Sequence, residues 1–290
     1  MGAGELHLCP RPLPAVPGAR AQEAPGECGS LSTSYANRQG YGTHRALRRF
    51  CRACREHRWI LQADIRQYFP SIDHRLLLAQ LAGLIACGGT LWLLERILAN
   101  GAIDGAAIDA FPGDTLLTPL ERPRGLPIGN LTSQFLANLH LDRLDHRLKA
   151  LPGVRVSLRY VDDLALFADR PAPLIQALDV LRDELSALRL RLHPRKTRLL
   201  PTARGASFVG FHVIGGRIRL RNHSLLRIRK GLKLCQKAIL QRRCSVARAR
   251  RSALSWNAHL AHGHTLRLRQ RLFRSHRFCA DLSPLLAYNN

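Results

Sequence analysis

The sequence predicts an α+β fold built around an antiparallel sheet. Strand-like and helical segments follow the order β-α-α-β-β-α-β-β, which lacks the strict alternation of a parallel sheet. Two pairs of strand-like runs are separated by only two residues, the spacing of β-hairpins. An apolar fraction of 46% over 290 residues is enough for a sizeable core and excludes a disordered chain.

The first half contributes one strand and its flanking helices. Residues 43–59 have helical spacing, with Thr43 as a candidate N-cap. A strand begins at the end of this segment and stops near Asp64. Residues 71–85 then read as an amphipathic helix that opens at Ser71, followed by a weaker helix and a Gly- and Pro-rich connection.

The second half contains both candidate hairpins. Residues 125–149 read as a Gly/Pro turn that feeds one long helix. The hairpins follow in residues 157–169 and 207–220, the second around a Gly-Gly pair, with a helix from about 172 to 190 between them. From Leu225 onward the chain is helical and strongly basic.

The composition indicates a reduced, cytoplasmic protein that does not enter a membrane. The eight cysteines show no disulfide-framework spacing, and residues 1–30 lack the apolar core of a signal peptide. No run approaches the roughly 18 apolar residues of a membrane span.

The charge is strongly positive: 45 Lys and Arg against 20 Asp and Glu give +25. Such a field attracts polyanions, of which nucleic acid is the first candidate. A basic composition inherited from a GC-rich genome would give the same balance, so charge alone leaves both interpretations open.

Adjacent aspartates, Asp162 and Asp163, lie between two strand-like runs and are expected to form the two-residue turn of the first hairpin. Asp is common in turns, so this placement has a purely structural explanation. Asp64, however, ends another apolar strand and would bring a further carboxylate to the same place. Divalent cations relieve the repulsion within such a cluster, and pairs of them catalyse phosphoryl transfer. An acidic centre in a basic chain is typical of polymerases and nucleases.

Five segments, in the order of the family's motifs A to E, resemble reverse transcriptases over roughly residues 34–278. They read ADIRQYFPSIDH, GLPIGNLTSQFLANLHLDRLD, YVDD, RLHPRKT and FVGF. The resemblance implies a right-hand polymerase with a palm built on an antiparallel sheet, partial fingers and a helical thumb. It divides the chain into a disordered or unrelated leader (1–30), partial fingers and palm (31–215) and a basic thumb (216–290).

The resemblance also implies a site that binds two Mg²⁺ ions, or Mn²⁺ as a substitute. The metal ligands would be Asp64, Ile65, Asp162 and Asp163. The three aspartates among them would also be catalytic. Lys196 would donate a proton to departing pyrophosphate, although a solvated turn lysine is an equal alternative.

Two further groups of residues are implied around the nucleotide and the primer. The nucleotide-binding residues would be Phe69, Gly129, Gln134 and Tyr160, with Phe69 as a steric gate against a ribose 2′-OH or simply a core residue. The primer grip would be Phe208, Gly210 and Phe211. Members of the family usually have a longer fingers region than this chain, which implies an N-terminal truncation or an upstream start. The remaining candidates for contacts with the triphosphate are Arg38, Arg45 and Arg48.

Motif B narrows the resemblance to the enzymes of diversity-generating retroelements. Its segment IGNLTSQ has Ile128 and Gln134 where most reverse transcriptases have Gln and Pro. Such enzymes copy a template RNA into cDNA, misincorporate opposite adenines, and act with a small, basic accessory variability protein. Template RNA, an RNA–DNA duplex and dNTPs would be the other partners. Another bacterial class of reverse transcriptase, or a non-catalytic RNA-binding remnant, are the open alternatives.

Overall fold

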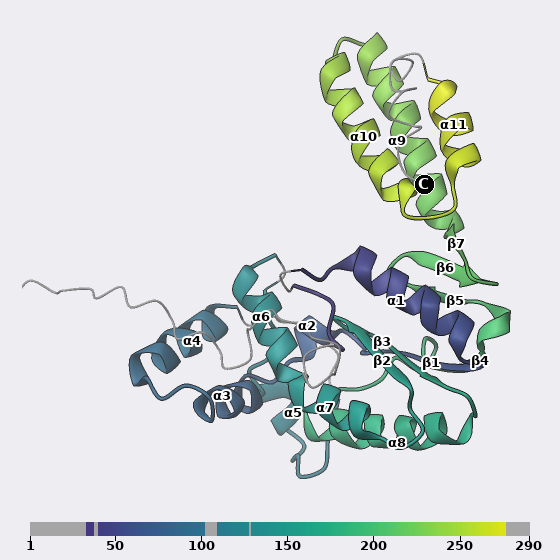
Figure 1. Ribbon diagram of the computed structural model, residues 1–290. Helices are drawn as coiled ribbons and strands as arrows, with labels where there is room; N and C mark the ends of the chain where they lie inside the picture. Colours follow the sequence, from purple (N-terminus) through teal and green to yellow (C-terminus); the bar gives the residue numbers. More distant parts are fainter. Residues whose placement is uncertain (1–32, 38–39, 102–108, 128, 277–290) are drawn as a thin grey trace, which may run out of the picture.

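A four-stranded antiparallel sheet forms the centre of the protein, in the order β2-β3-β1-β4. The computed structural model describes residues 33–37, 40–101, 109–127 and 129–276, so the predicted leader, Arg38 and Ile128 lie outside the described residues. Figure 1 shows helices on both faces of this sheet, which confirms the α+β class. The strands are β1 (Trp59–Asp64), β2 (Val156–Tyr160), β3 (Asp163–Ala168) and β4 (Arg198–Pro201).

Both faces of the sheet are buried, which is why β3 (DLALFA) reads as an almost continuous apolar run. In β1, Leu61 and Ala63 belong to the core on one face and Ile60 to the core on the other. The first face is covered by α3 (His74–Ala82), α6 (Leu131–His140), α7 (Asp142–Ala150) and α8 (Ala172–Ala187). The second is covered by α1 (Thr43–Glu56) and a small antiparallel sheet of β5 (Ala206–Phe208), β6 (Phe211–Ile214) and β7 (Arg217–Leu220).

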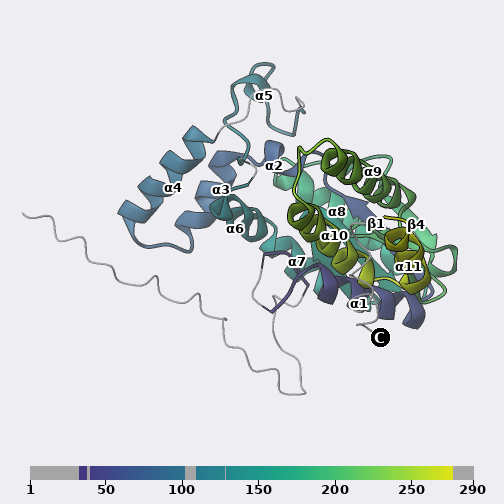
Figure 2. The ribbon, with the colours of Figure 1, turned by 90° about the horizontal axis from the view of Figure 1, so that it is seen from above.

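Short elements complete this part of the chain. They are α2 (Tyr68–Ser71), α4 (Gly88–Asn100), α5 (Thr118–Glu121) and the 3₁₀ turn η2 (Thr202–Arg204). Figure 2 shows α3 and α4 projecting to one side of the sheet, beyond α6. None of the helices in the described ranges is long and apolar enough to cross a membrane.

Three helices after β7 form a separate bundle with its own small core. They are α9 (Asn222–Leu240), α10 (Val246–Ala261) and α11 (Leu266–Arg274). A Cβ added to Gly231 in α9 would lie 2.6 Å from the ring of Trp256 in α10. Glycine is therefore needed at this position for the two helices to approach so closely.

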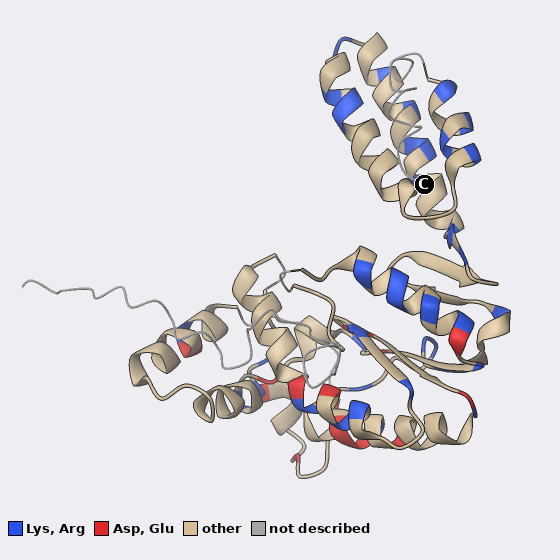
Figure 3. Ribbon diagram, viewed as in Figure 1, with Lys and Arg blue, Asp and Glu red and all other residues tan. Residues whose placement is uncertain are grey.

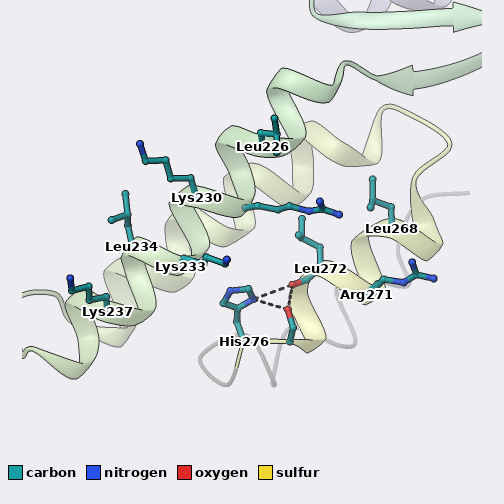
Figure 4. A pocket seen from close by; sticks show the side chains of 11 residues that line it. Leu226, Lys230, Lys233, Leu234, Lys237, Leu268, Arg271, Leu272 and His276 are labelled. Atoms are coloured by element: carbon teal, nitrogen blue, oxygen red, sulfur yellow. Dashed lines mark hydrogen bonds between the residues drawn. The ribbon is translucent and has the colours of Figure 1, made fainter.

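The bundle carries positive charge that no acidic residue offsets. Between Glu184 and Asp281 the sequence contains no Asp or Glu, and Figure 3 shows basic residues on all three helices. A groove of about 750 Å³ between α9 and α11 has leucines in its lining, with basic side chains around them (Figure 4). This part of the chain therefore presents a surface suited to negatively charged partners.

Helix ends differ from the sequence prediction at three places. Gly42, not Thr43, is the N-cap of α1, and Thr43 begins the helix with its hydroxyl 2.9 Å from the Tyr160 hydroxyl. Helix α3 begins after Asp73, whose carboxylate accepts from the N–H groups of the first turn, rather than at Ser71. The predicted long helix after residue 125 is divided into α6 and α7 at Leu141.

Turn chemistry in the second hairpin region follows the sequence more closely. Gly215 and Gly216 connect β6 to β7 with φ values of +54° and +70°, the left-handed pair that a two-residue hairpin turn requires. This confirms the predicted Gly-Gly hairpin. A second tight turn, at Val209 and Gly210, connects β5 to β6.

The packing of Phe167 in the central core can be tested by substitution. Phe167 in β3 is fully buried and meets the ring of Phe50 in α1 edge to face at 5.4 Å. Phe167→Ala is expected to lower the free energy of unfolding by about 3–5 kcal/mol, because it leaves a cavity. Phe135→Ala, at a side chain that is 55% exposed, should change it by no more than about 0.5 kcal/mol. Urea denaturation of both variants measures the difference; equal losses would contradict this assignment of the core.

Candidate active site

Acidic side chains meet at one end of the two central strands. Asp64, the last residue of β1, lies opposite Asp163, the first residue of β3. Residues that pair across an antiparallel sheet point to the same face. Here it is the face covered by α1, since Ile60 and Ala165 on the same alternation belong to that core. The sheet register thus brings together carboxylates that are 99 residues apart in the sequence.

The turn of the first hairpin is formed by Val161 and Asp162, not by Asp162 and Asp163 as the sequence predicted. Tyr160 pairs directly with Asp163, so Asp163 already belongs to β3. Val161 has φ +59°, an unusual value for a β-branched residue that costs on the order of 1–3 kcal/mol and persists only where the surroundings hold it. The amide of Ile65 donates to the carbonyl oxygen of Asp162 at 3.2 Å and ties this turn to the end of β1.

A cavity of about 530 Å³ lies beside the turn. It is lined by Asp64, Ile65, Arg66, Gln67, Tyr68, Asp162, His193 and Lys196. The ammonium of Lys196 is 2.8 Å from Oδ2 of Asp64, and the Lys196 side chain is 57% exposed against 8% for Asp64. The segment that carries Lys196 is fixed to β1 by a bond of 2.7 Å from the amide of His193 to the Asp64 carbonyl oxygen.

Burial and repulsion shift the titration of this cluster. Burial, together with the charges of Asp162 and Asp64, raises the pKa of Asp163 to about 6, against the opposing effect of Lys196 and Arg221. Burial also raises the pKa of Asp162, and Asp64 adds to that shift. The hydrogen bond to Asp64 raises the pKa of Lys196. Carboxylates that resist ionisation in this way are stabilised by a bound cation.

The donor set suits a hard divalent ion. Asp64 and Asp162 both line the cavity and offer carboxylate oxygens. Within the ranges that the structure describes, no group of three or more His, Cys, Asp or Glu side chains is arranged to bind a metal ion by itself. Mg²⁺ does not require one, because it commonly takes one or two protein carboxylates and completes its shell with water and substrate phosphates.

The residues predicted to contact a nucleotide differ in their burial, and none of them lines the cavity. Phe69, in α2, packs partly against the core, and its neighbour Tyr68 lines the cavity instead. Gly129 is exposed with φ +104° just before α6, and Gln134 is half-buried in the first turns of that helix. Tyr160 shares the sheet face of Asp163, which it neighbours across the hairpin.

The predicted primer-grip residues form a hairpin whose rings serve the core. Phe208 and Phe211 are cross-strand partners, both buried, and Phe208 stacks on Phe50 with ring centroids 4.7 Å apart. The turn between them, Val209 and Gly210, has φ values of +42° and +86° and is partly exposed. Only this turn is therefore placed to meet a ligand.

Sequence reasoning missed four side chains that line the cavity: Arg66, Gln67, Tyr68 and His193. Arg66 pairs with Asp109 at 2.7 Å, and Gln67 has a left-handed φ of +46°. The available signal was position, because Arg66 and Gln67 directly follow the Asp64 strand.

The sequence profile of the family described as reverse transcriptase (RNA-dependent DNA polymerase) matches residues 30–213. The chain belongs to the reverse transcriptase family. The matched segment contains Asp64, the Val161–Asp163 region and Lys196, so the candidate site lies inside the reverse transcriptase domain.

Several known proteins are similar to this reverse transcriptase. Protein YkfC of Escherichia coli (strain K12) is 25% identical over 198 residues, which cover 56% of this chain and 48% of that protein. The chain thus spans about half the length of this curated relative. Among solved structures, apo telomerase from Candida tropicalis, truncated from its C-terminal domain, superposes with a TM-score of 0.48 at 11% identity over 65% of this chain and 41% of that one. Telomerase from Candida albicans with a fragment of telomeric RNA gives 0.45 at 13% identity over 84% and 44%.

The raised pKa of Asp163 predicts how stability varies with pH. Between the usual Asp value of 3.8 and about 6 the folded state holds a proton that the unfolded chain has lost, so stability falls as pH rises through this window. Asp163→Asn removes that loss and should stabilise the protein at pH 8 by about 3 kcal/mol relative to wild type, with little difference at pH 4.

Urea denaturation in the presence of EDTA at both pH values measures this effect. The control is Asp179→Asn, at an aspartate of α8 that is 64% exposed, which should show no comparable gain. An Asp163→Asn variant that is no more stable than wild type at pH 8 would contradict the repulsion described for this cluster.

Proposed function

We propose that this reverse transcriptase is an RNA-directed DNA polymerase that extends a DNA primer on an RNA template. The observation that carries the proposal is the meeting of Asp64, Asp162 and Asp163 from adjacent strands, beside a cavity, within the segment that matches the family. Nucleotidyl transfer needs a group of carboxylates that can bind divalent cations, since the triphosphate brings negative charge that such cations neutralise.

The carboxylates of Asp64 and Asp162, with Asp163 and Ile65 beside them, would hold two Mg²⁺ ions, or Mn²⁺ in their place. The bound ions would supply neutralisation of the phosphates and activation of the primer hydroxyl. Lys196, which pairs with Asp64 and is otherwise exposed, would donate a proton to the leaving pyrophosphate. The ammonium group of a lysine is protonated at neutral pH, as a proton donor must be.

The surrounding residues would orient the nucleotide and the primer. Phe69, Gly129, Gln134 and Tyr160 are proposed to contact the nucleotide, and the hairpin of Phe208, Gly210 and Phe211 to hold the primer end. The order along the chain supports partial fingers and palm in residues 31–215 and a thumb in 216–290. The acid-free bundle α9–α11 would hold template RNA and the RNA–DNA duplex by their backbones.

Primer extension on an RNA template tests this function. Asp162→Ala should abolish incorporation of dNTPs, because it removes a carboxylate from the cavity, while leaving RNA binding intact. Asp179→Ala, at an exposed aspartate of α8, should extend primers like wild type. If wild type and Asp162→Ala both bind RNA but neither extends a primer, the chain is an RNA-binding protein without polymerase activity.

We further propose that the enzyme is error-prone and belongs to a bacterial diversity-generating retroelement, with a small basic accessory variability protein as partner. The support is the motif B segment with Ile128 and Gln134. Gln134 lies at the start of α6, where a changed side chain could loosen the fit of a base pair. A different bacterial class of reverse transcriptase is the alternative.

Sequencing the cDNA products distinguishes the two classes. The retroelement reading predicts misincorporation concentrated opposite template adenines, and Gln134→Pro is expected to reduce it. The same polymerase assay supplies the material, with a template that contains all four bases in equal number as its internal control. Errors scattered evenly over the four template bases would count against the retroelement assignment.

A further inference from the structure

The guanidinium of Arg159 lies where the turn that bears Asp162 meets helices α6 and α7. Arg159 stands next to Tyr160 at the end of β2, and alternation along the strand directs its side chain to the face opposite Asp163. The side chain is only 1% exposed. A charge buried so deeply must have its partners inside the protein.

All five N–H groups of this guanidinium have acceptors. Nε donates to Oδ1 and Oδ2 of Asp145 in α7 at 2.8 and 3.0 Å, and Nη2 to Oδ2 at 2.6 Å. Nη1 and Nη2 donate to the side-chain and main-chain oxygens of Asn138 in α6 at 3.1 and 3.4 Å. Nη1 also donates to the carbonyl oxygen of Val161, the left-handed turn residue, at 3.3 Å.

The same residue anchors the beginning of the described chain. Its amide donates to the carbonyl oxygen of Thr33 at 2.8 Å, and its carbonyl oxygen accepts from the amide of Tyr35 at 2.9 Å. Asn138 extends the connection by donating to the carbonyl oxygen of Ala36 at 2.9 Å. Arg159 therefore joins the turn to two helices and to the segment that precedes α1.

We propose that Arg159 is a positioning residue for the nucleotidyl transfer described above: by holding the Val161 carbonyl oxygen, it keeps Val161 in its left-handed conformation and fixes the direction of Asp162. The inference rests on the proposed polymerase function. Valine at φ +59° needs an external hold. Lysine could keep the charge pair with Asp145, but it lacks the planar fork that reaches Asp145, Asn138 and Val161 together.

Arg159→Lys in the full chain tests this role, with Arg122→Lys as the matched control. Arg122 is likewise buried and paired with two carboxylates, Asp73 and Asp114, but it has no bond to the turn. Arg159→Lys should lower kcat by about 10- to 100-fold and raise the Mg²⁺ concentration needed for half-maximal rate, with KM for primer–template unchanged. Arg122→Lys should lower thermal stability without changing kcat or the Mg²⁺ requirement.

A second comparison separates positioning from general stabilisation. Glycine adopts a left-handed φ without strain, so Arg159→Lys should cost less activity in a Val161→Gly background than in wild type. If Arg159→Lys does not fold, Arg159→Met combined with Asp145→Leu, which removes both buried charges, takes its place with the same expected results.

Three results would overturn the inference. One is a kcat and Mg²⁺ requirement for Arg159→Lys equal to those of wild type. Another is a loss of activity that parallels the loss of thermal stability equally in Arg159→Lys and Arg122→Lys. The third is an effect of Arg159→Lys on activity that is as large with Gly at position 161 as with Val. A wild-type chain that extends no primer contradicts the proposed function itself and removes the inference with it.

Discussion

Six residue pairs join β1 to β3, and the last of them sets Asp64 opposite Asp163. A slip of one residue in this pairing would turn Asp64 to the other face of the sheet, among the leucines that α8 covers. The apolar alternation of both strands prevents such a slip, because Ile60 and Leu61 must remain in different cores. The packing of the sheet and the assembly of the site are therefore set by the same register.

The site combines charges that oppose one another. Burial and the nearby Asp64 carboxylate raise the pKa of Asp162 and of Asp163, and Lys196 opposes part of that shift. An ion pair with one exposed partner is easily exchanged for a stronger cation, since the lysine loses little burial when it moves. Such an exchangeable ion pair would suit the charged ligands of the proposed polymerase reaction.

Much of the fold could be predicted because its signals are local. The Gly215-Gly216 hairpin, the strand ending at Asp64 and the helix after residue 172 each follow from turn chemistry or apolar spacing. That Val161, rather than Asp163, shares the first turn with Asp162 could not be predicted. Valine is a poor turn residue, and only tertiary contacts hold it there. The break between α6 and α7 at Leu141 has no local signal of the Gly or Pro kind. Within the site, strand ends and motif order predict the aspartates and Lys196. His193 has no comparable signal, because only the fold brings its loop to the end of β1.

The long acid-free stretch from residue 185 to 280 makes the three-helix bundle a small polyelectrolyte. Its helices cannot neutralise one another by internal ion pairs with Asp or Glu, so they repel across a distance set by the Debye length, about 8 Å at physiological salt. A polyanion laid along the bundle relieves that repulsion and stabilises the helices that hold it. Folding of this part of the chain and its occupation by a negatively charged partner are thereby thermodynamically linked, and each strengthens the other.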